Sequence, residues 1–248
     1  MAKISAISAA GYAEPESDRL GAAALAPIAR ETVQERVYRQ LRKALIYGRF
    51  EPGQALTLQE LATSLDTSAT PIREALARLV SEQALEAASN RSVRVPPVSI
   101  ARIDDLLQAR RVIEGAVLEL AAPRLTAADF RALRAESAAY ARIAARPGRL
   151  KIDDALESNL NFHFHLYGAC GSPVLTPIIE SLWLQSGALV RSAVAKFKPD
   201  GAISAFHFHD QIVDALERGD VAAARTALAA DIGRAFDLLR NELREAGE

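Results

Sequence analysis

The stretch from Gly48 to Val95 restricts the possible fold more than any other part of the chain. It contains two short helical patterns separated by a tight polar turn at residues 66–68. Two segments of alternating residues follow, on either side of residues 89–91, and predict a small hairpin. Two helices joined by a short turn are typical of a helix-turn-helix, whose second helix can enter the major groove of DNA. The stretch therefore predicts a winged helix-turn-helix head.

Local signals predict the first two helices of this head. Apolar residues recur every four positions from Val33 to Leu45, which is the pattern of an amphipathic helix, and Gly48 can cap its end. Thr57 and Glu60 have the spacing of a capping box, in which each side chain accepts a hydrogen bond from the other residue's backbone N–H. A second helix is therefore expected from about residue 58 to residue 65.

The next helix is expected to read DNA. We predict Thr70 as its N-cap and Pro71 as its first residue, because a proline there loses no helical hydrogen bond. Arg73 then lies on the first turn, where an arginine guanidinium can donate two hydrogen bonds to the edge of a guanine base. The alternative is a surface ion pair of Arg73 with Glu60 or Glu74, but the helix-turn-helix context favours DNA contact. The candidate DNA-binding residues are Arg36, Arg49, Ser68, Thr70, Arg73, Arg78, Arg91 at the wing tip, and Arg94, which could equally be a solvated charge.

A second domain is expected after the stiff pair Pro96-Pro97. Proline and glycine breaks separate six helical segments, at roughly 100–122, 126–145, 151–170, 173–195, 202–218 and 220–245. The predicted fold is mainly α, with an N-terminal winged helix-turn-helix and a C-terminal antiparallel six-helix bundle. The expected divisions are a mobile N-terminal extension (1–29), the DNA-binding head (30–97) and the bundle (98–248).

Composition excludes several classes of protein. Residues 30–97 hold ten Lys and Arg against eight Asp and Glu, and residues 98–248 hold eighteen against twenty, so bulk charge alone does not diagnose nucleic-acid binding. The single Cys170 excludes an internal disulfide framework. No apolar run approaches the roughly 18 residues of a membrane helix, and the first residues are too weakly apolar for a signal peptide. A cytoplasmic location is expected.

The bundle carries a candidate metal site. All four histidines lie in two His-Phe-His triplets, and residues two apart on a helix point about 200° away from each other, so only one histidine of each triplet can face the core. The apolar stripes place four polar residues inward: Asn159, His163, His209 and Asp231. Burying such groups without partners is costly. They could share a divalent ion, or each could form independent buried hydrogen bonds, and the pattern leaves both open.

Residues 32–97 resemble the winged-helix domain of the GntR family of bacterial transcription regulators. The resemblance rests on Gly48–Gly53, Leu58–Ala62 and Ser68–Leu76. Two positions depart from the family pattern: Ala69 stands where Arg is usual, and Ser92 stands where the wing usually has Gly. The first departure removes a common operator contact, so the operator preference of other members is not expected here.

Residues 100–245 resemble the FCD effector domain of the FadR-like branch of that family, and six helices fit its VanR-like subgroup. Arg110–Glu114, Phe162-His163, Gly171–Pro173 and His209–Ile212 match its motifs. Many members bind a divalent metal through one Asp and three His. The matching positions here are Asn159, His163, His209 and Asp231, with the carboxylate moved to the last position. Zn²⁺ or Ni²⁺ is the implied ion, although the exchange reduces affinity for nitrogen-preferring metals.

The resulting hypothesis is a homodimeric, ligand-responsive transcription regulator. It would bind an inverted-repeat operator in double-stranded DNA and hold a small anionic metabolite, a carboxylate, next to the metal. Arg110 is the candidate partner of that carboxylate, or else a charge on the helix surface. The rival readings are a constitutive DNA-binding protein whose bundle only dimerises, and a metal-dependent enzyme. Catalysis is disfavoured, because neither inward histidine follows a Glu by three residues.

Overall fold

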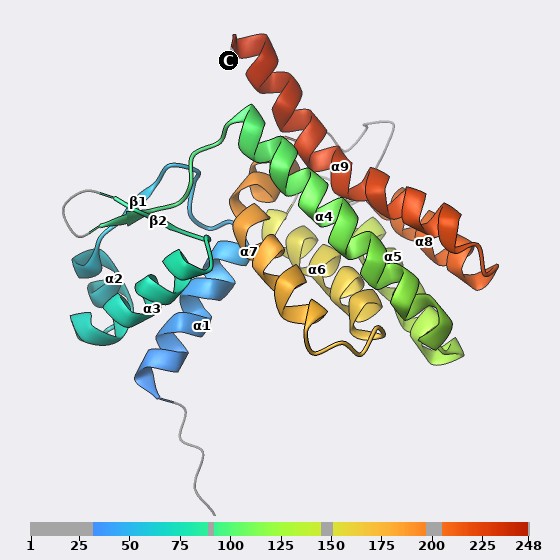
Figure 1. The fold of residues 1–248 in the computed structure, drawn as a ribbon, viewed down its shortest axis with the longest axis horizontal. Coiled ribbons are helices and arrows are strands. Elements are labelled where there is room, and N and C mark those ends of the chain that lie inside the picture. The colour runs from blue at the N-terminus through green and yellow to red at the C-terminus, as the bar shows by residue number, and fades with distance from the viewer. Residues whose placement is uncertain (1–31, 89–91, 145–150, 197–204, 248) are drawn as a thin grey trace, which may run out of the picture. The chain divides into compact units, whose positions relative to one another are not determined.

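The computed structural model describes residues 32–88, 92–144, 151–196 and 205–247. In these residues the chain forms nine α-helices and one small three-stranded sheet (Figure 1). The predicted class is therefore confirmed: a winged helix-turn-helix followed by a helical bundle. The predicted N-terminal extension lies outside the described residues. None of the described helices is long and apolar enough to span a membrane.

The head begins with α1 (Val33–Ile46), followed by α2 (Leu58–Ser64) and α3 (Ala69–Ser81). The predicted capping box at the start of α2 is confirmed. The Glu60 backbone N donates to the Thr57 hydroxyl at 3.2 Å, and the Thr57 backbone N donates to the Glu60 carboxylate at 3.3 Å. Two backbone donors that the first turn of a helix leaves unpaired are satisfied in this way.

The predicted start of α3 was wrong. The helix begins at Ala69 with Ser68 as its N-cap, so Thr70 is the second helical residue and Pro71 the third. Proline is tolerated at any of these places, because the first backbone N–H groups of a helix have no partner within it. The Ser68 side chain makes no capping hydrogen bond. The hydroxyl of Ser68 is therefore not committed to holding the helix start.

The wing has three strands in its described residues, one more than the sequence predicted. They are β1 (Ala55–Leu56), β2 (Glu86–Ala87) and β3 (Val93–Arg94), arranged antiparallel in the order β1-β3-β2. A strand of two residues between a turn and a helix is too short to show alternation, which is why β1 was missed. The wing tip, including Arg91, lies outside the described residues.

Six helices form the bundle in the part of the chain that the structure describes, as predicted. They are α4 (Ile100–Ala121), α5 (Ala127–Ala144), α6 (Ile152–Gly168), α7 (Leu175–Val194), α8 (Ala205–Glu217) and α9 (Val221–Ala246). Helix α7 contacts α4, α6 and α9 of the bundle, and it also contacts α1 of the head (Figure 1). The elements from α1 to α9 belong to one compact unit.

Helix α7 contributes to two hydrophobic cores. Trp183 packs in the core of the bundle, whereas Leu184 and Ala188 pack in the core of the head. Gly187 lies against the end of α1: a Cβ added there would come within 2.0 Å of the Leu45 carbonyl oxygen. Only a residue without a side chain permits this approach of the two backbones.

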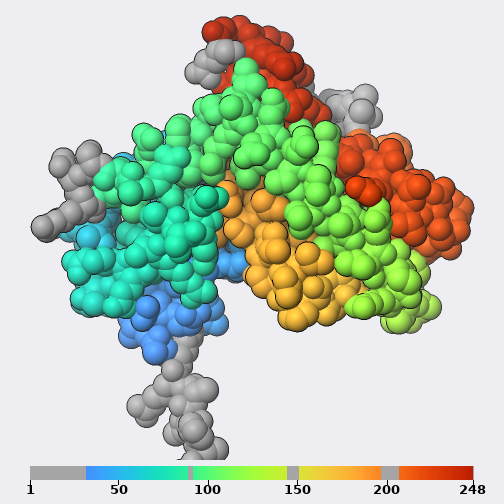
Figure 2. All heavy atoms as spheres, viewed as in Figure 1, coloured from blue at the N-terminus to red at the C-terminus, as the bar shows by residue number. Residues whose placement is uncertain are grey.

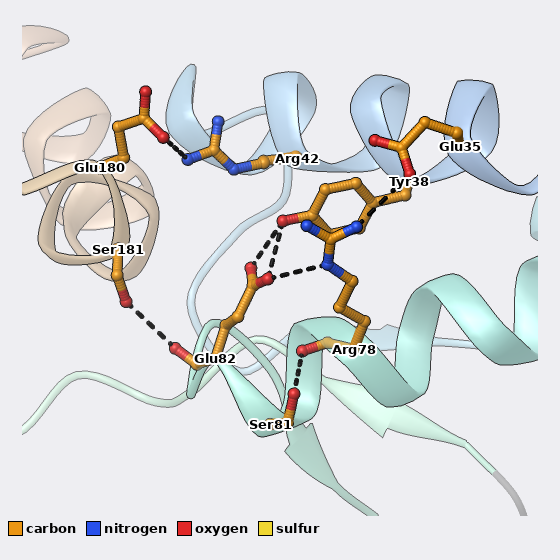
Figure 3. A network of polar contacts seen from close by, with 8 residues as sticks. All are labelled: Glu35, Tyr38, Arg42, Arg78, Ser81, Glu82, Glu180 and Ser181. Atoms are coloured by element: carbon orange, nitrogen blue, oxygen red, sulfur yellow. Dashed lines mark hydrogen bonds and ion pairs between the residues drawn. The ribbon is translucent and has the colours of Figure 1, made fainter. Parts of the chain in front are cut away.

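A polar network flanks the same contact (Figure 3). Arg42 of α1 pairs with Glu180 of α7 at 2.8 Å. The Tyr38 hydroxyl donates to the Glu82 carboxylate at 2.7 Å, and the guanidinium of Arg78 lies 3.6 Å from the centre of the Tyr38 ring. The head and α7 are therefore joined by charge pairing as well as by apolar packing.

Candidate functional site

The exposed face of α3 is the candidate DNA-reading surface. Arg73 is exposed on the first turns of the helix, and Ser68 and Thr70 are exposed beside it. The alternative ion pairs of Arg73 with Glu60 or Glu74 are not found among the described residues. Figure 2 shows the residues of α2 and α3 open at the surface. The buried side of α3 holds Ile72, Ala75, Leu76 and Leu79.

The other arginine candidates in the described part of the head differ in what they contact. Arg36 is exposed on α1. Arg49 lies 3.8 Å from Asp153, and Arg94 pairs across the wing with Glu86 at 3.0 Å. Arg78 is held by Glu35 and Glu82 above the Tyr38 ring. A DNA phosphate would have to compete with these carboxylates at all three paired arginines.

Three of the four predicted metal ligands meet inside the bundle. His163 of α6, His209 of α8 and Asp231 of α9 are all buried, and one ligand atom from each lies within 4.8 Å of the others. The Nε2 of His163 is 2.9 Å from the Asp231 Oδ2, and the Nε2 of His209 is 3.8 Å from the same oxygen. Two ligands of one zinc ion lie at most about 4.2 Å apart, and both of these distances are within that limit.

The protonation states of this cluster suit a cation. Burial, helped by the charges of His163 and Arg234 against the opposing charge of Asp231, lowers the pKa of His209 to about 3. Burial alone would raise the pKa of Asp231, but the hydrogen bond with His163 and nearby positive charges lower it to about 2. At neutral pH the site therefore offers a neutral imidazole and a carboxylate, the forms that bind metal.

Buried polar atoms without hydrogen-bond partners test whether these residues fit a metal ion. Neither ring nitrogen of His209, nor Oδ1 of Asp231, has a hydrogen-bond partner within the described chain. Buried polar atoms without partners are costly, and a shared cation would satisfy them. Asn159, the fourth predicted ligand, is half-buried and lines the same cavity as His163 and Asp231. These residues fit a divalent ion held by two imidazoles, a carboxylate and an amide oxygen.

The outer histidines of the two triplets do not join this cluster. His165 lies between Glu136 at 3.2 Å and Asp129 at 3.4 Å, both on α5. His207 is exposed, with its Nε2 2.8 Å from Gln211. The prediction that one histidine of each triplet faces inward agrees with these positions.

Arg110 is not the surface charge that the alternative reading allowed. It is 4% exposed, and its Nε donates to Glu114 at 2.6 Å. The guanidinium lies 4.5 Å from the centre of the Trp183 ring. The hydrogen bonds found for it use Nε and Nη2, which leaves Nη1 free of hydrogen bonds within the described residues.

Two residues that the sequence reading missed connect Arg110 with the metal cluster. Glu114 is fully buried and accepts hydrogen bonds from Arg110 and from the Tyr167 hydroxyl. The Tyr167 hydroxyl also lies 3.0 Å from Nδ1 of His163. This contact fixes the His163 ring with Nε2 toward Asp231, as outer partners of metal ligands commonly do. The four-residue spacing of Arg110 and Glu114 was the signal that could have identified Glu114.

Two family descriptions match this chain. Residues 33–95 match the bacterial regulatory proteins of the gntR family, and residues 105–234, more than half of the chain, match the FCD domain. The first match covers α1 to the wing. The second covers the part of the bundle that contains Arg110 and the three clustered ligands.

Known relatives agree with both matches. The chain is 29% identical over 193 residues to the transcriptional regulator McbR of Escherichia coli, covering 78% of this chain and 86% of McbR. It is 28% identical over 152 residues to the repressor RspR of Escherichia coli, covering 61% of this chain and 65% of RspR.

Solved structures share the fold. The structure of E. coli McbR/YncC superposes with a TM-score of 0.78 at 25% identity, covering 86% of this chain and 100% of that chain. A GntR regulator from Rhodococcus sp. RHA1 superposes with a TM-score of 0.65 at 23% identity, covering 83% of this chain and 96% of that chain. The matching families and relatives are transcription regulators and not enzymes. The chain therefore belongs to the GntR family, in the branch with an FCD domain, and is a DNA-binding transcription regulator.

Proposed function

We propose that this regulator acts as a homodimer on an inverted-repeat operator and that a small carboxylate, bound beside a divalent metal in the bundle, changes its affinity for DNA. The observation that carries the proposal is the buried cluster of His163, His209 and Asp231, in which His209 and Asp231 have polar atoms without hydrogen-bond partners in the described chain. Two of its members, His163 and Asp231, line a cavity that Arg110 also lines. The head (30–97) and the bundle (98–248) are the proposed functional divisions.

Helix α3 is the proposed reading element. Arg73 would contact a base edge from its first turns, with Ser68 and Thr70 close to the DNA backbone. Arg36, Arg49, Arg78, Arg91 and Arg94 complete the proposed DNA-binding set. The paired arginines at 49, 78 and 94 would exchange their carboxylate partners for phosphates.

The proposed ligands of the metal are Asn159, His163, His209 and Asp231, and Zn²⁺ or Ni²⁺ is the proposed ion. When bound, the ion would supply positive charge that attracts an anionic ligand. Arg110 would hold the carboxylate of that ligand through its remaining donors. The effector would act by binding two arrangements of the protein with different affinity.

Binding to operators selected from a random double-stranded DNA library tests the reading surface. We expect the selected sequences to contain two inverted half-sites, because a two-fold dimer presents two equivalent heads. Arg73→Ala should weaken binding by about 1–3 kcal/mol, which is the loss typical of a base-reading arginine. Gel-shift titrations measure the change.

Arg131→Ala is the matched control, because Arg131 is an exposed arginine on α5 of the bundle. It should leave DNA affinity unchanged. Equal affinity of Arg73→Ala and the unmodified protein for the selected operator would refute the placement of α3 in the groove.

A further inference from the structure

We infer that the effector is a carboxylate with an apolar tail, and that this tail reaches the last turn of α1, so that the ligand contacts the DNA-binding head directly. The inference deepens the proposed function and rests on its effector site. It starts from two adjacent cavities inside the compact unit. We call them the metal cavity, which Asn159, His163 and Asp231 help to line, and the α1 cavity, which Ile46 and Tyr47 help to line.

The two cavities share a wall. Arg110, Leu156, Asn159, Trp183 and Val190 line both of them. A ligand held at Arg110 therefore lies at the border between the two spaces. Its carboxylate end would face the metal cavity and its other end would face the α1 cavity.

The linings differ in chemistry. To the shared wall the metal cavity adds the charged and polar groups of His163, Asp231 and Arg234, together with Tyr140 and four aliphatic residues, Ala155, Val194, Ile232 and Ala235. The α1 cavity adds Ile46, Tyr47, Leu160, Ser186 and Gly187. The Ser186 hydroxyl already donates to the Leu182 carbonyl oxygen at 2.7 Å, so it does not call for a polar ligand group. The α1 cavity is therefore suited to an aliphatic or aromatic tail.

The sizes of the cavities explain why such a tail would act on the head. The metal cavity has a volume of about 30 Å³. The α1 cavity has a volume of about 10 Å³, and this second volume is close to the space that one water molecule needs. An apolar tail cannot enter the α1 cavity unless its wall moves. Ile46 is the last residue of α1, and Tyr47 follows it. The wall that moves therefore includes part of the head.

The end of α1 is also tied to α7 and α6. The Arg191 guanidinium of α7 donates to the Tyr47 carbonyl oxygen at 3.1 Å and pairs with Asp153 of α6. Gly187 of α7 touches the Leu45 and Ile46 carbonyl groups. A tail that enlarges the α1 cavity strains these contacts, whereas a ligand confined to the metal cavity does not touch them, because Tyr47, Gly187 and Arg191 do not line that cavity. Tail length therefore decides whether binding reaches the head.

A series of straight-chain carboxylates from acetate to decanoate tests this inference on the metal-loaded full-length protein. Affinity should rise by roughly threefold to fourfold for each methylene that enters the apolar space, and then level off. Acids too short to reach α1 should bind without changing operator affinity, and longer acids should change it. Thermal shifts report binding, and gel shifts with the selected operator report the response of the head.

Leu160→Phe provides the decisive variant, since Leu160 lines the α1 cavity but not the metal cavity. It should weaken the binding of long acids at least tenfold and leave acetate unaffected. The neighbouring Asn161→Phe is the matched control, because Asn161 is exposed on the same helix. Unchanged Zn²⁺ binding by both variants shows that the bundle remains folded.

The outcomes separate the inference from the proposed function. If short and long acids bind alike, or Leu160→Phe weakens both equally, the tail does not reach α1 and the inference is overturned, while a carboxylate effector stands. If long acids bind more tightly but operator affinity never changes, direct contact with the head is overturned. If no acid in the series binds the metal-loaded protein, the carboxylate effector itself is overturned, and the inference fails with it.

Discussion

At the scale of single residues, the polar groups of this protein divide into those with partners and those without. Glu114 and Tyr167 are deeply buried but satisfied by each other and by Arg110 and His163. His209 has both ring nitrogens unsatisfied in the same core. Satisfied groups stabilise the bundle, whereas unsatisfied groups indicate where an additional ligand belongs.

The two histidines of α8 provide a matched pair for the metal prediction. His209→Gln should lower Zn²⁺ affinity by more than about tenfold, because even the outer partners of metal ligands contribute tenfold to a hundredfold. His207→Gln changes the same residue type two positions earlier, at an exposed site, and should leave the affinity as it was. Isothermal titration with Zn²⁺ and elemental analysis of the purified proteins measure the difference. Equal affinities for the two variants would remove His209 from the metal site.

Tyr38 gives a prediction at alkaline pH. Burial, followed by the hydrogen bond to Glu82, raises the pKa of Tyr38 to about 12, against about 10 when the chain is unfolded. Its contribution to the free energy of unfolding is therefore fully present below pH 10 and is lost as the pH rises toward 12. Tyr38→Phe should cost about 1–2 kcal/mol at pH 8, and this cost should shrink above pH 10. Urea midpoints of both proteins from pH 8 to pH 11.5 test it; a cost that stays constant throughout would contradict it.

At the scale of elements, apolar spacing predicted the helices well. All six bundle segments and the three head helices lie within a few residues of their predicted bounds, because each buries one stripe against a neighbour. The start of α3 was placed wrongly because proline is compatible with several first-turn positions. The strand β1 was missed because its pairing with β3 depends on residues almost forty positions apart.

The contact between α1 and α7 could not be predicted in this way. In the sequence, Gly48 indicates only the end of a helix. No local signal explains why a glycine stands at position 187, inside a helix. The structure gives the reason: a Cβ at Gly187 would lie 2.0 Å from the Leu45 carbonyl oxygen, and one at Gly48 would lie 2.4 Å from the Gly187 carbonyl oxygen. Contacts between distant segments depend on the folded geometry, which spacing along the chain does not contain.

Gly187→Ala is therefore expected to separate α1 from α7. The added methyl group meets backbone atoms that cannot rotate away, so the free energy of unfolding should fall by about 1–3 kcal/mol. Gly168→Ala is the control: a Cβ at Gly168, the last residue of α6, meets nothing within 4 Å, and alanine there should be neutral or slightly stabilising. Thermal and urea unfolding distinguish the two. A Gly187→Ala protein as stable as the Gly168→Ala protein would show that α1 and α7 can move apart without cost.

At the scale of the whole molecule, the proposed inverted-repeat operator requires two heads. The chain has a mass of 26.7 kDa, and sedimentation equilibrium should give twice that mass in the absence of DNA. The melting temperature should rise with protein concentration, because a dimer is favoured by mass action. A particle of single-chain mass at every concentration, both with and without operator, would contradict the homodimer.

The candidate site was also only partly predictable. The inward positions of His163, His209 and Asp231 follow from helical periodicity, and the structure brings them together. Their tie to Arg110 through Glu114 and Tyr167 depends on how α4 and α6 pack, which periodicity does not specify. The α1 cavity lies beyond sequence reasoning for the same reason, since it joins residues from α1, α4, α6 and α7.

The neighbouring residues Trp183 and Leu184 have a consequence for engineering. One belongs to the core of the bundle and the other to the core of the head, on a single stiff helix. A chimera could carry a foreign head joined to this bundle at Pro97. Leu184, Ala188 and Gly187 would then lie against a head whose residues differ from those they pack against here. Exchanging DNA specificity between such regulators therefore requires transplanting one face of α7 together with the head, although more than eighty residues of sequence separate them.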